Sequence, residues 1–416
     1  MLSKEENELL TRTDPGTPCG DLLRRYWQPV ALSEELGTYP IPLRIMGEDL
    51  VLFRDDQGRI GLLDIHCSHR AADLSYGRAE DGGLRCIYHG WLYDVNGRCL
   101  ETPAEPEGSN LRLTIRHPAY PCQERGGVIF AYMGPGEPPL LPAYAVLAAP
   151  PERRVMTKYY HECNYLQGLE GNEDSTHVRF LHRFLNTESG ARFLQAHPSE
   201  NNTEFRTPER GKFYGPTEIE ETDFGVWSNG RPGFLLPSLA LTGGGPQPYG
   251  DGYMLYWRVP IDDTHHWLYI MAFKESGPIL QEKRHGWTDA LVGADYRPYR
   301  NLSNRYLQDR EEQRTATFTG MGPVFPPHDA CVNEGAGPIQ DRTREHLGSA
   351  DSVIPACRKL MLRCIRMVQE GHDPAGVIRD AEVNRADPLW LRVNAPPPPE
   401  AAAARAADFW VESVRG

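Results

Sequence analysis

The sequence contains no long apolar run. None of its hydrophobic stretches approaches the roughly 18 to 20 consecutive apolar residues that a transmembrane helix needs. The N-terminal stretch MLSKEENELLTRT also lacks the apolar core of a signal peptide and carries acidic charge, so it resembles neither a secretory nor a mitochondrial targeting segment. We therefore expect a cytoplasmic protein without a membrane span.

Basic residues are scarce relative to acidic ones. The 44 Lys and Arg residues stand against 57 Asp and Glu residues, which gives a net charge of −13, and no Lys- or Arg-rich run occurs. Proteins that bind nucleic acids normally carry a basic excess, so the composition argues against such a partner. The G-x-G-x-x-G fingerprint of dinucleotide binding is also missing, and we expect NADH not to bind to this chain.

The chain is long enough to bury a core without disulfides. Its 416 residues correspond to two or three domains. The nine cysteines are odd in number and follow no signal sequence, so we interpret them as reduced thiols, of which a few are available to bind metal. The 40 Gly and 36 Pro residues favour many turns and short strands over a helical bundle.

The chain has two consecutive regions of different sequence character, and no internal repeat is visible. From about Arg25 to Gly134, short β-like runs such as LRCIYHGWLYD and GVIFAYMG are bounded by turn residues. A Pro-rich linker over 136–155 follows. Beyond it we predict helices over 164–184, 281–315 and 352–370, strands within 204–273, and a short helix after the C-terminal polyproline run.

The first candidate metal site combines a C-x-H with a C-x-x-H pattern. Its residues are Cys67 and His69, then, after a gap of sixteen residues, Cys86 and His89. Two cysteines and two histidines also suit zinc, but zinc sites usually pair cysteines with cysteines. One cysteine and one histidine from each loop suit a Rieske [2Fe–2S] cluster, in which thiolates bind one iron and imidazoles the other. We expect Tyr88 and Trp91 to shield the cluster, and we interpret the adjacent His66 as structural.

The second candidate site lies in the run NYLQGLEGNEDSTHVRFLHRF. Glu170, Asp174 and His177 have the i, i+4, i+7 spacing of one helix face. His182 would lie about 140° away from His177 on a regular helix, so the two converge only if the helix ends or widens between them, as in a π-bulge. Two imidazoles and a carboxylate form the facial triad of non-haem Fe(II) oxygenases. A pair of solvated helix histidines is the alternative.

The run CSHRAADLSYGRAEDGGLRCIYHGWLYDVNGRC resembles the fingerprint of Rieske non-haem iron aromatic-ring oxygenases, with Ala71 in place of the usual Gly. Segments over nearly the whole chain resemble the phthalate dioxygenase-type branch, which includes aromatic carboxylate dioxygenases and O-demethylases of methoxyarenes. The resemblance implies an α+β fold. An all-β Rieske domain (26–135) is inserted into a catalytic domain (156–416), whose curved antiparallel sheet is gripped by helices as in START/Bet v1-like proteins. Residues 1–25 would be a helical segment that packs with the catalytic domain.

The same resemblance implies roles for individual residues. His177 and His182 would bind the mononuclear iron. Asp174 would be the bridging carboxylate that accepts hydrogen bonds from an iron-ligand histidine and from a Rieske histidine of the neighbouring subunit. Proteins of this branch form trimers, some of them stacked as hexamers.

The carboxylate ligand must come from further along the chain. Asp309, Asp329, Glu334, Asp341 and Asp351 are the candidates. Spacing and resemblance favour Asp329, followed by Asp341 or Glu334. We interpret Asp309 with Arg310 and Asp341 with Arg342 as structural ion pairs. His328 is interpreted as incidental, because one carboxylate completes the triad.

These features indicate the terminal oxygenase of a multicomponent system. A separate NADH-dependent flavin and iron–sulfur reductase would supply electrons, and the substrate would be a small aromatic compound oxidised with O2. O-demethylation or monohydroxylation is favoured; ring cis-dihydroxylation is the alternative, and a Rieske electron carrier or a zinc-stabilised binding module is more remote. The candidate substrate-binding residues are Asn164, Gln167, Leu181, Phe184, Arg206, Arg210, Trp227, Arg231 and Phe234.

Overall fold

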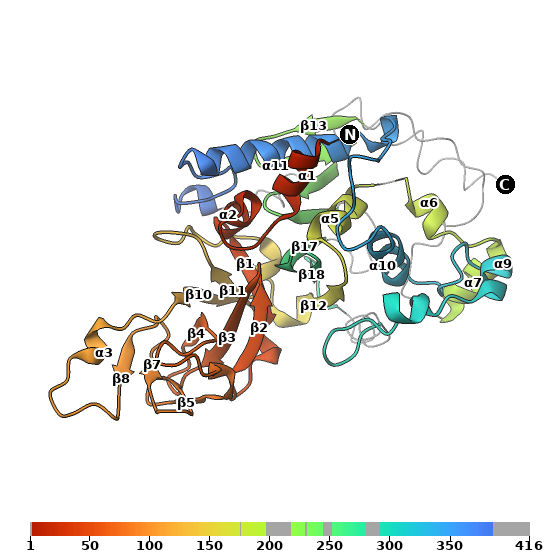
Figure 1. Cartoon of the computed structure of the whole chain (residues 1–416). Coiled ribbons are helices and arrows are strands. Elements are labelled where there is room, and N and C mark those ends of the chain that lie inside the picture. Colours follow the sequence, from red (N-terminus) through yellow and green to blue (C-terminus); the bar gives the residue numbers. More distant parts are fainter. Residues whose placement is uncertain are drawn as a thin grey trace.

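The computed structural model describes residues 2–174, 176–196, 218–228, 231–243, 252–279 and 291–385. A smaller all-β lobe projects from a larger lobe in which helices surround a sheet (Figure 1). The expected fold class is therefore confirmed. None of the helices in these ranges combines the length and the apolar character that a membrane span requires.

The smaller lobe consists of three small antiparallel sheets, as the short β-like runs predicted. Their strand orders are β1-β11-β10, β2-β3-β4-β9 and β5-β6-β7-β8. A separate hydrophobic cluster beneath the last two sheets includes Val51, Leu63, Leu84 and Tyr93. The strands are β1 (Trp27–Leu32), β2 (Ile41–Ile45), β3 (Glu48–Arg54), β4 (Ile60–Asp64), β5 (Arg78–Glu80), β6 (Gly83–Arg85), β7 (Leu92–Tyr93), β8 (Cys99–Glu101), β9 (Ala119–Tyr120), β10 (Cys122–Arg125) and β11 (Val128–Tyr132).

The larger lobe is built on a seven-stranded antiparallel sheet of order β12-β18-β17-β16-β15-β14-β13. The long strands β17 and β18 are nearly continuous in buried side chains, because helices and the smaller lobe pack on this sheet. The predicted strands are thus present within 218–273, while 204–217 lies outside the described residues. The strands are β12 (Arg154–His161), β13 (Ile219–Glu221), β14 (Gly225–Ser228), β15 (Arg231–Leu235), β16 (Leu239–Gly243), β17 (Tyr253–Asp262) and β18 (His265–Phe273).

Helix α11 (Val353–Gln369) confirms the helix predicted over 352–370. Its apolar positions at three- and four-residue spacing are buried, because this face packs on the sheet and on the N-terminal helices. Those helices, α1 (Lys4–Thr11) and α2 (Pro18–Arg24), lie beside α11 in Figure 1, within the larger lobe. The chain therefore starts in one lobe, forms the other, and returns through α4 (Ala145–Ala148) and a short 3-10 turn, η3 (Pro151–Arg153).

Two predictions of long helices were wrong, because the structure contains shorter helical segments in these ranges. The segment 164–184 contains α5 (Tyr165–Glu173) and a one-turn helix, α6 (Val178–Leu181), because the chain leaves helical geometry at Asp174. The described part of 281–315 contains a 3-10 segment, η5 (Leu302–Leu307), and the short α9 (Arg310–Thr315). Residues 280–290 and the C-terminal tail, including its predicted helix, lie outside the described residues.

Helix α10 (Phe325–Gly335) is not among the helices that we predicted. Its two prolines, Pro326 and Pro327, both lie in the first turn of the helix. The backbone N–H groups of a first turn have no partner within the helix, so proline is tolerated there. Helix α10 packs against α5 and brings Asp329, from late in the chain, next to the two histidines that flank α6.

Candidate metal centres

The two Cys/His loops of the smaller lobe have the same backbone geometry. The Ala71 N–H donates to the Cys67 carbonyl at 2.8 Å, and the Gly90 N–H donates to the Cys86 carbonyl at 3.0 Å. The fourth residue after each cysteine has a left-handed φ, +56° at Ala71 and +75° at Gly90. Each cysteine N–H also bonds the carbonyl five residues later, in Ala72 and Trp91 respectively. The second loop meets the left-handed requirement with glycine, whereas the first meets it with alanine.

The cysteines of these loops face inward and the histidines face outward. Cys67 and Cys86 are each only 3% exposed, and burial followed by the neighbouring Cys67 raises the pKa of Cys86. His69 is exposed and His89 is half-buried, with ring centroids 4.5 Å apart. Such an arrangement places thiol ligands in the protein and imidazoles at the surface, where electrons could leave.

Aromatic side chains surround this loop pair. Trp91 stacks on His69 at 4.5 Å with nearly parallel rings, and the Tyr93 hydroxyl lies 3.2 Å from the Cys67 sulfur. Tyr88 lies against His89, although it is 55% exposed. Hydrogen bonds to the sulfurs and limited access of water are the factors that set the potential of an iron–sulfur cluster.

The four loop residues do not converge on a single point. Within the described residues, only one group of three or more His, Cys, Asp or Glu side chains brings its ligand atoms within 4.8 Å of one another, and it lies in the larger lobe. Tetrahedral zinc would require all four donors around one ion. A binuclear cluster separates the thiolate pair from the imidazole pair, so the observed arrangement favours the cluster.

The convergent group in the larger lobe is His177, His182 and Asp329. The two histidines flank the single turn of α6 as its N-cap and C-cap residues, so a short helix brings them together without a π-bulge. Asp329 comes from α10, with its Oδ1 3.0 Å from Nε2 of His182 and 3.6 Å from Nε2 of His177. Burial acts to raise the pKa of Asp329, but His182 and His177 outweigh it and hold that pKa below its usual value.

The two histidines have different surroundings. His182 is 1% exposed, and Phe325 stacks on its ring at 4.0 Å and 5°. His328, which we had interpreted as incidental, has its Nδ1 3.0 Å from Nδ1 of His182. The side chain of His177 is 23% exposed and lies near the surface.

Asp174 lies beside His177 at the end of α5. Its Oδ1 accepts hydrogen bonds from the backbone N–H of Thr176 at 2.8 Å and of His177 at 3.3 Å. Its Oδ2 lies 3.8 Å from Nδ1 of His177, and the side chain is 31% exposed. The carboxylate is therefore next to the imidazole but is still accessible from outside the chain.

Of the alternative carboxylates, Glu334 is the most buried, at 4% exposure. It accepts hydrogen bonds from the Tyr306 hydroxyl and the Glu162 N–H, and it lies 3.2 Å from Nδ1 of His161. These contacts hold Glu334 away from His177 and His182, although it shares helix α10 with Asp329.

The interpretation of two ion pairs was wrong. Asp309 caps α9 by accepting the N–H groups of Glu311 and Glu312, and Asp341 accepts hydrogen bonds from Thr343. The Asp351 carboxylate likewise accepts the Gly348 N–H. Aspartate often bonds backbone N–H groups two or three residues ahead, so a neighbouring arginine in the sequence is a poor guide to its partner.

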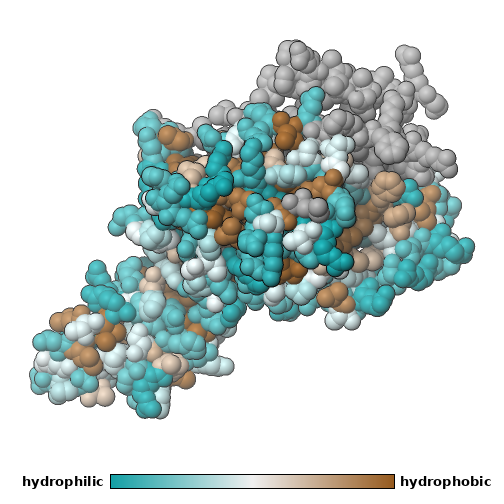
Figure 2. All heavy atoms as spheres, turned by 45° about the horizontal axis from the view of Figure 1, so that its top comes forward, coloured by the Kyte–Doolittle hydropathy of each residue, from teal (hydrophilic) through white to brown (hydrophobic). Residues whose placement is uncertain are grey.

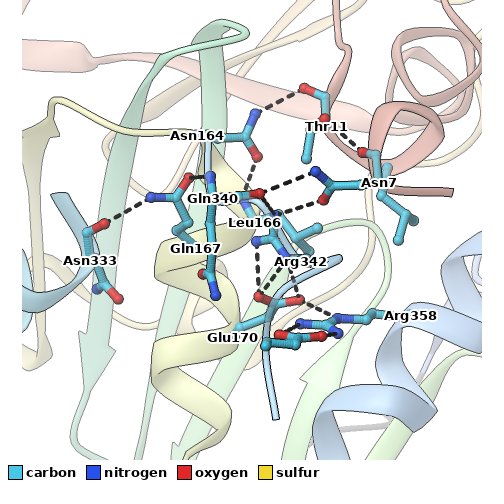
Figure 3. Close-up of polar contacts among 12 residues, drawn as sticks. Asn7, Thr11, Asn164, Leu166, Gln167, Glu170, Asn333, Gln340, Arg342 and Arg358 are labelled. Carbon is cyan, nitrogen blue, oxygen red and sulfur yellow. Dashed lines mark hydrogen bonds and ion pairs between the residues drawn. The ribbon is translucent and has the colours of Figure 1, made fainter. Parts of the chain in front are cut away.

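Figure 3 shows where Glu170 and the polar residues of α5 point. Glu170 accepts from Arg342 at 3.0 Å and from Arg358 at 2.6 Å, and both arginines are almost fully buried. Asn164 caps α5 and donates to the Thr11 and Asp263 carbonyls. Gln167 donates to the Asn333 and Gly337 carbonyls and accepts the Gln340 N–H. These contacts assign both amides to packing and capping of α5.

The other candidate pocket residues are distributed differently. Phe184, Trp227 and Phe234 are buried, the last two within the main hydrophobic core, and Leu181 is half-buried on α6. Arg231 lies in β15, but its side chain is outside the described part of the chain. Arg206 and Arg210 are also outside the described residues.

Sequence reasoning missed a buried carboxyl immediately before Asp174. Glu173 is 9% exposed, and its Oε1 has no hydrogen-bond partner among the described residues. Burial raises the pKa of Glu173 to about 8, although the Phe234 N–H partly opposes this. Glu173 lies at the end of α5 and faces β15. The sequence does not indicate that this residue is buried, because burial depends on which elements pack against each face of the helix.

Comparison with known proteins identifies two families and several related oxygenase subunits. Residues 26–121 match the Rieske [2Fe-2S] domain family, and residues 248–388 match the family described as LigXa C-terminal domain like. The chain is 37% identical to the phthalate 4,5-dioxygenase oxygenase subunit of Pseudomonas putida, over 90% of this chain and 89% of the relative. It is 34% identical to the 5,5'-dehydrodivanillate O-demethylase oxygenase subunit of a Sphingobium strain, over 94% and 86%.

A solved structure extends the comparison to the fold. The oxygenase in the reduced complex of oxygenase and ferredoxin in carbazole 1,9a-dioxygenase matches with a TM-score of 0.54. The match covers 92% of this chain and 98% of that chain at 19% sequence identity. The two-lobed architecture is therefore shared.

Proposed function

This chain belongs to the Rieske non-haem iron oxygenases, and from that premise we propose how its residues serve the reaction and which substrate class it takes. It is the oxygenase subunit of a multicomponent Rieske system, and the cofactors of the family are a Rieske [2Fe–2S] cluster and a mononuclear iron. The single observation that carries the proposal is the convergence of His177, His182 and Asp329 in a chain that also contains the Rieske loops.

We assign the cluster to the Cys67, His69, Cys86 and His89 side chains. The iron is assigned to His177, His182 and Asp329, because two neutral imidazoles and one carboxylate match the donor set of the 2-His-1-carboxylate triad. When bound, the iron would supply O2 activation. The chain itself holds the three ligands, and the stacked Phe325 limits the access of water to one side of His182.

Electron transfer is proposed to cross between subunits. In Figure 1, strands β5 and β7, which border the cluster loops, lie in the smaller lobe, well away from α6 and α10 in the larger one. Figure 2 shows that lobe projecting from the larger one with apolar surface at its free end. Tyr76, Ile87 and Tyr88 are exposed on the smaller lobe, and Phe180 is exposed on α6. A head-to-tail ring joins two different surfaces of the same chain, and the proposed assembly is such a trimer or a hexamer of two stacked trimers.

In such a ring, Asp174 would connect the two sites. Its accessible carboxylate lies next to His177 and would accept a hydrogen bond from His69 or His89 of the neighbouring subunit. Electrons would enter the system through a separate NADH-dependent reductase, in keeping with the absence of a dinucleotide fingerprint in this chain. We propose that this system works in the cytoplasm.

The proposed substrate is a small aromatic compound that carries a carboxylate or a methoxy group. The O-demethylase relative, which is 34% identical over 94% of this chain, favours O-demethylation. The relative of 37% identity is a dioxygenase, which keeps ring cis-dihydroxylation as the second candidate. Both reactions need the same triad, and the pocket decides which carbon faces it.

The experiment uses iron-replete protein, a compatible NADH reductase and matched pairs of methoxylated and unmethoxylated aromatic acids. Products are identified by mass, and formaldehyde is measured in parallel. A product that has lost one methyl, with one equivalent of formaldehyde, supports O-demethylation. A product that has gained two hydroxyls without formaldehyde supports dihydroxylation. NADH consumption with only peroxide across the panel would contradict the substrate class.

A further inference from the structure

We propose that His328 is a positioning residue that fixes the ring orientation and the tautomer of His182, so that Nε2 of His182 faces the metal. The inference rests on the proposed function, because it takes His182 as an iron ligand. It assigns a role to a side chain that is adjacent to a ligand in sequence but is not a ligand itself.

The Gly322 carbonyl, which contacts His328, determines the directions of the hydrogen bonds between His328 and His182. Nε2 of His328 lies 2.9 Å from the Gly322 carbonyl, and a carbonyl oxygen can only accept. Nε2 of His328 therefore carries a proton, and in the neutral imidazole its Nδ1 is the acceptor. That Nδ1 lies 3.0 Å from Nδ1 of His182, which must then donate. Neutral His182 is left with its lone pair on Nε2, the atom that lies 3.0 Å from Asp329.

The first turns of α10 enclose the His182 ring on three sides. Phe325, His328 and Asp329 occupy positions i, i+3 and i+4, which share one helix face. Phe325 covers the face of the ring, His328 contacts the Nδ1 edge, and Asp329 lies at the Nε2 edge. His328 is itself 1% exposed, so water cannot readily replace it as the acceptor.

His177 differs from His182, because none of the described residues accepts a hydrogen bond from its ring Nδ1. Its Nδ1 lies 3.8 Å from Asp174, which is beyond hydrogen-bond distance, and its side chain is partly exposed. Histidine ligands of metals usually donate their second N–H to a carboxylate, a carbonyl or water. Here the acceptor is a neutral imidazole, so the orientation of His182 is fixed without adding a negative charge beside the ligand.

The test measures Fe(II) binding to protein from which the mononuclear iron has been removed while the cluster remains. His328→Leu removes the acceptor but keeps an apolar volume, and we expect its Fe(II) affinity to fall 10- to 100-fold. In His328→Gln, the amide can donate to Gly322 and accept from His182, so affinity should remain within about threefold of the parent. Phe325→Leu is the matched control, which removes packing from the same ring but leaves the hydrogen bonds.

Cluster absorbance and thermal unfolding report whether each variant folds. The variant His182→Ala distinguishes a failure of the proposed iron site from a failure of the proposed role of His328. If that variant binds Fe(II) as tightly as the parent, the proposed iron site fails. If it loses Fe(II) while His328→Leu keeps full affinity, the site stands and the role of His328 is wrong. Equal losses in Phe325→Leu, His328→Leu and His328→Gln would also overturn the role, because packing rather than hydrogen bonding would then explain them.

Discussion

The two proposed metal centres of this chain are built in opposite ways. The proposed cluster loops lie within residues 67–91, in two turns that repeat the same backbone hydrogen bonds. The proposed iron site joins α6 to α10, so His177 and Asp329 are separated by 152 positions. The first site depends on local turns, whereas the second depends on the packing of α5, α10 and the sheet. A local site should tolerate damage to the larger lobe, and an assembled site should not.

Removing one proposed ligand from each site should show most clearly that the cluster and the mononuclear iron are held independently. We expect His89→Ala to abolish the Rieske absorbance and the signal of the reduced cluster in electron paramagnetic resonance. His177→Ala should keep both signals but lose the mononuclear iron, as measured by metal analysis. Each variant should lose all detectable product formation, because electron supply and O2 activation are both required. Full iron retention in His177→Ala would contradict the assignment of the second site.

The Glu170 cluster tests whether the iron site depends on distant packing. Glu170→Ala leaves Arg342 buried without a carboxylate and leaves Arg358 with Glu345 alone. Breaking a buried ion pair in this way costs about 3–5 kcal/mol, so we expect a large loss in the free energy of unfolding of the larger lobe. Urea unfolding followed by far-UV circular dichroism measures it.

A matched control for this change is Glu311→Ala. Its partner Arg314 is exposed, and such surface pairs contribute less than about 1 kcal/mol. In Glu170→Ala the mononuclear iron should be lost at lower urea than the cluster absorbance. Loss of both at the same urea concentration would show that the two centres do not differ in the way proposed.

Glu173 should make the stability of the larger lobe depend on pH. Its pKa is about 8 in the folded protein, against an ordinary value of 4.5. Below pH 4.5 both states are protonated, and as the pH rises toward 8 the unfolded state loses a proton that the folded state keeps. The folded state is therefore destabilised progressively, by roughly 3 kcal/mol at pH 7.

Glu173→Gln cannot ionise in either state and should remove this dependence. Its stability relative to the parent should rise from pH 5 to pH 8, as measured by urea unfolding at each pH. The Phe234 N–H that bonds Glu173 does not titrate, and burial and then Glu173 raise the pKa of the Cys357 thiol on α11 well above its usual value. A constant difference between the two proteins over this range would contradict the raised pKa.

The contrast between the centres also explains what the sequence could predict. The cluster loops follow from ligand type and spacing, because every residue that shapes them is nearby. His177 and His182 were recognisable as a pair, but their convergence required α6 to be a single turn, which periodicity alone does not indicate. Helix α10 was missed because Pro326 and Pro327 suggest a loop unless one knows that they begin a helix.

Residues that act across elements were the least visible in the sequence. His328 appeared incidental because its partner His182 lies 146 positions earlier. Glu170 has the spacing of a site residue, yet it pairs with arginines from the segment before α11 and from α11 itself. The chemistry of a carboxylate or imidazole does not indicate which distant group it meets, and only the packing of the helices on the sheet decides this.

The smallest predicted effect lies in the cluster loops themselves. Ala71 and Gly90 occupy equivalent left-handed positions. The left-handed conformation costs alanine about 1–2 kcal/mol of conformational free energy, which is partly offset by the lower entropy of its unfolded chain. We expect Ala71→Gly to stabilise the smaller lobe by about 0.5–1 kcal/mol. Gly90→Ala should destabilise it by more, because the added Cβ would also lie 3.2 Å from Pro103. The temperature at which the cluster absorbance is lost measures both changes, and shifts of the same sign would show that the two loops are not equivalent.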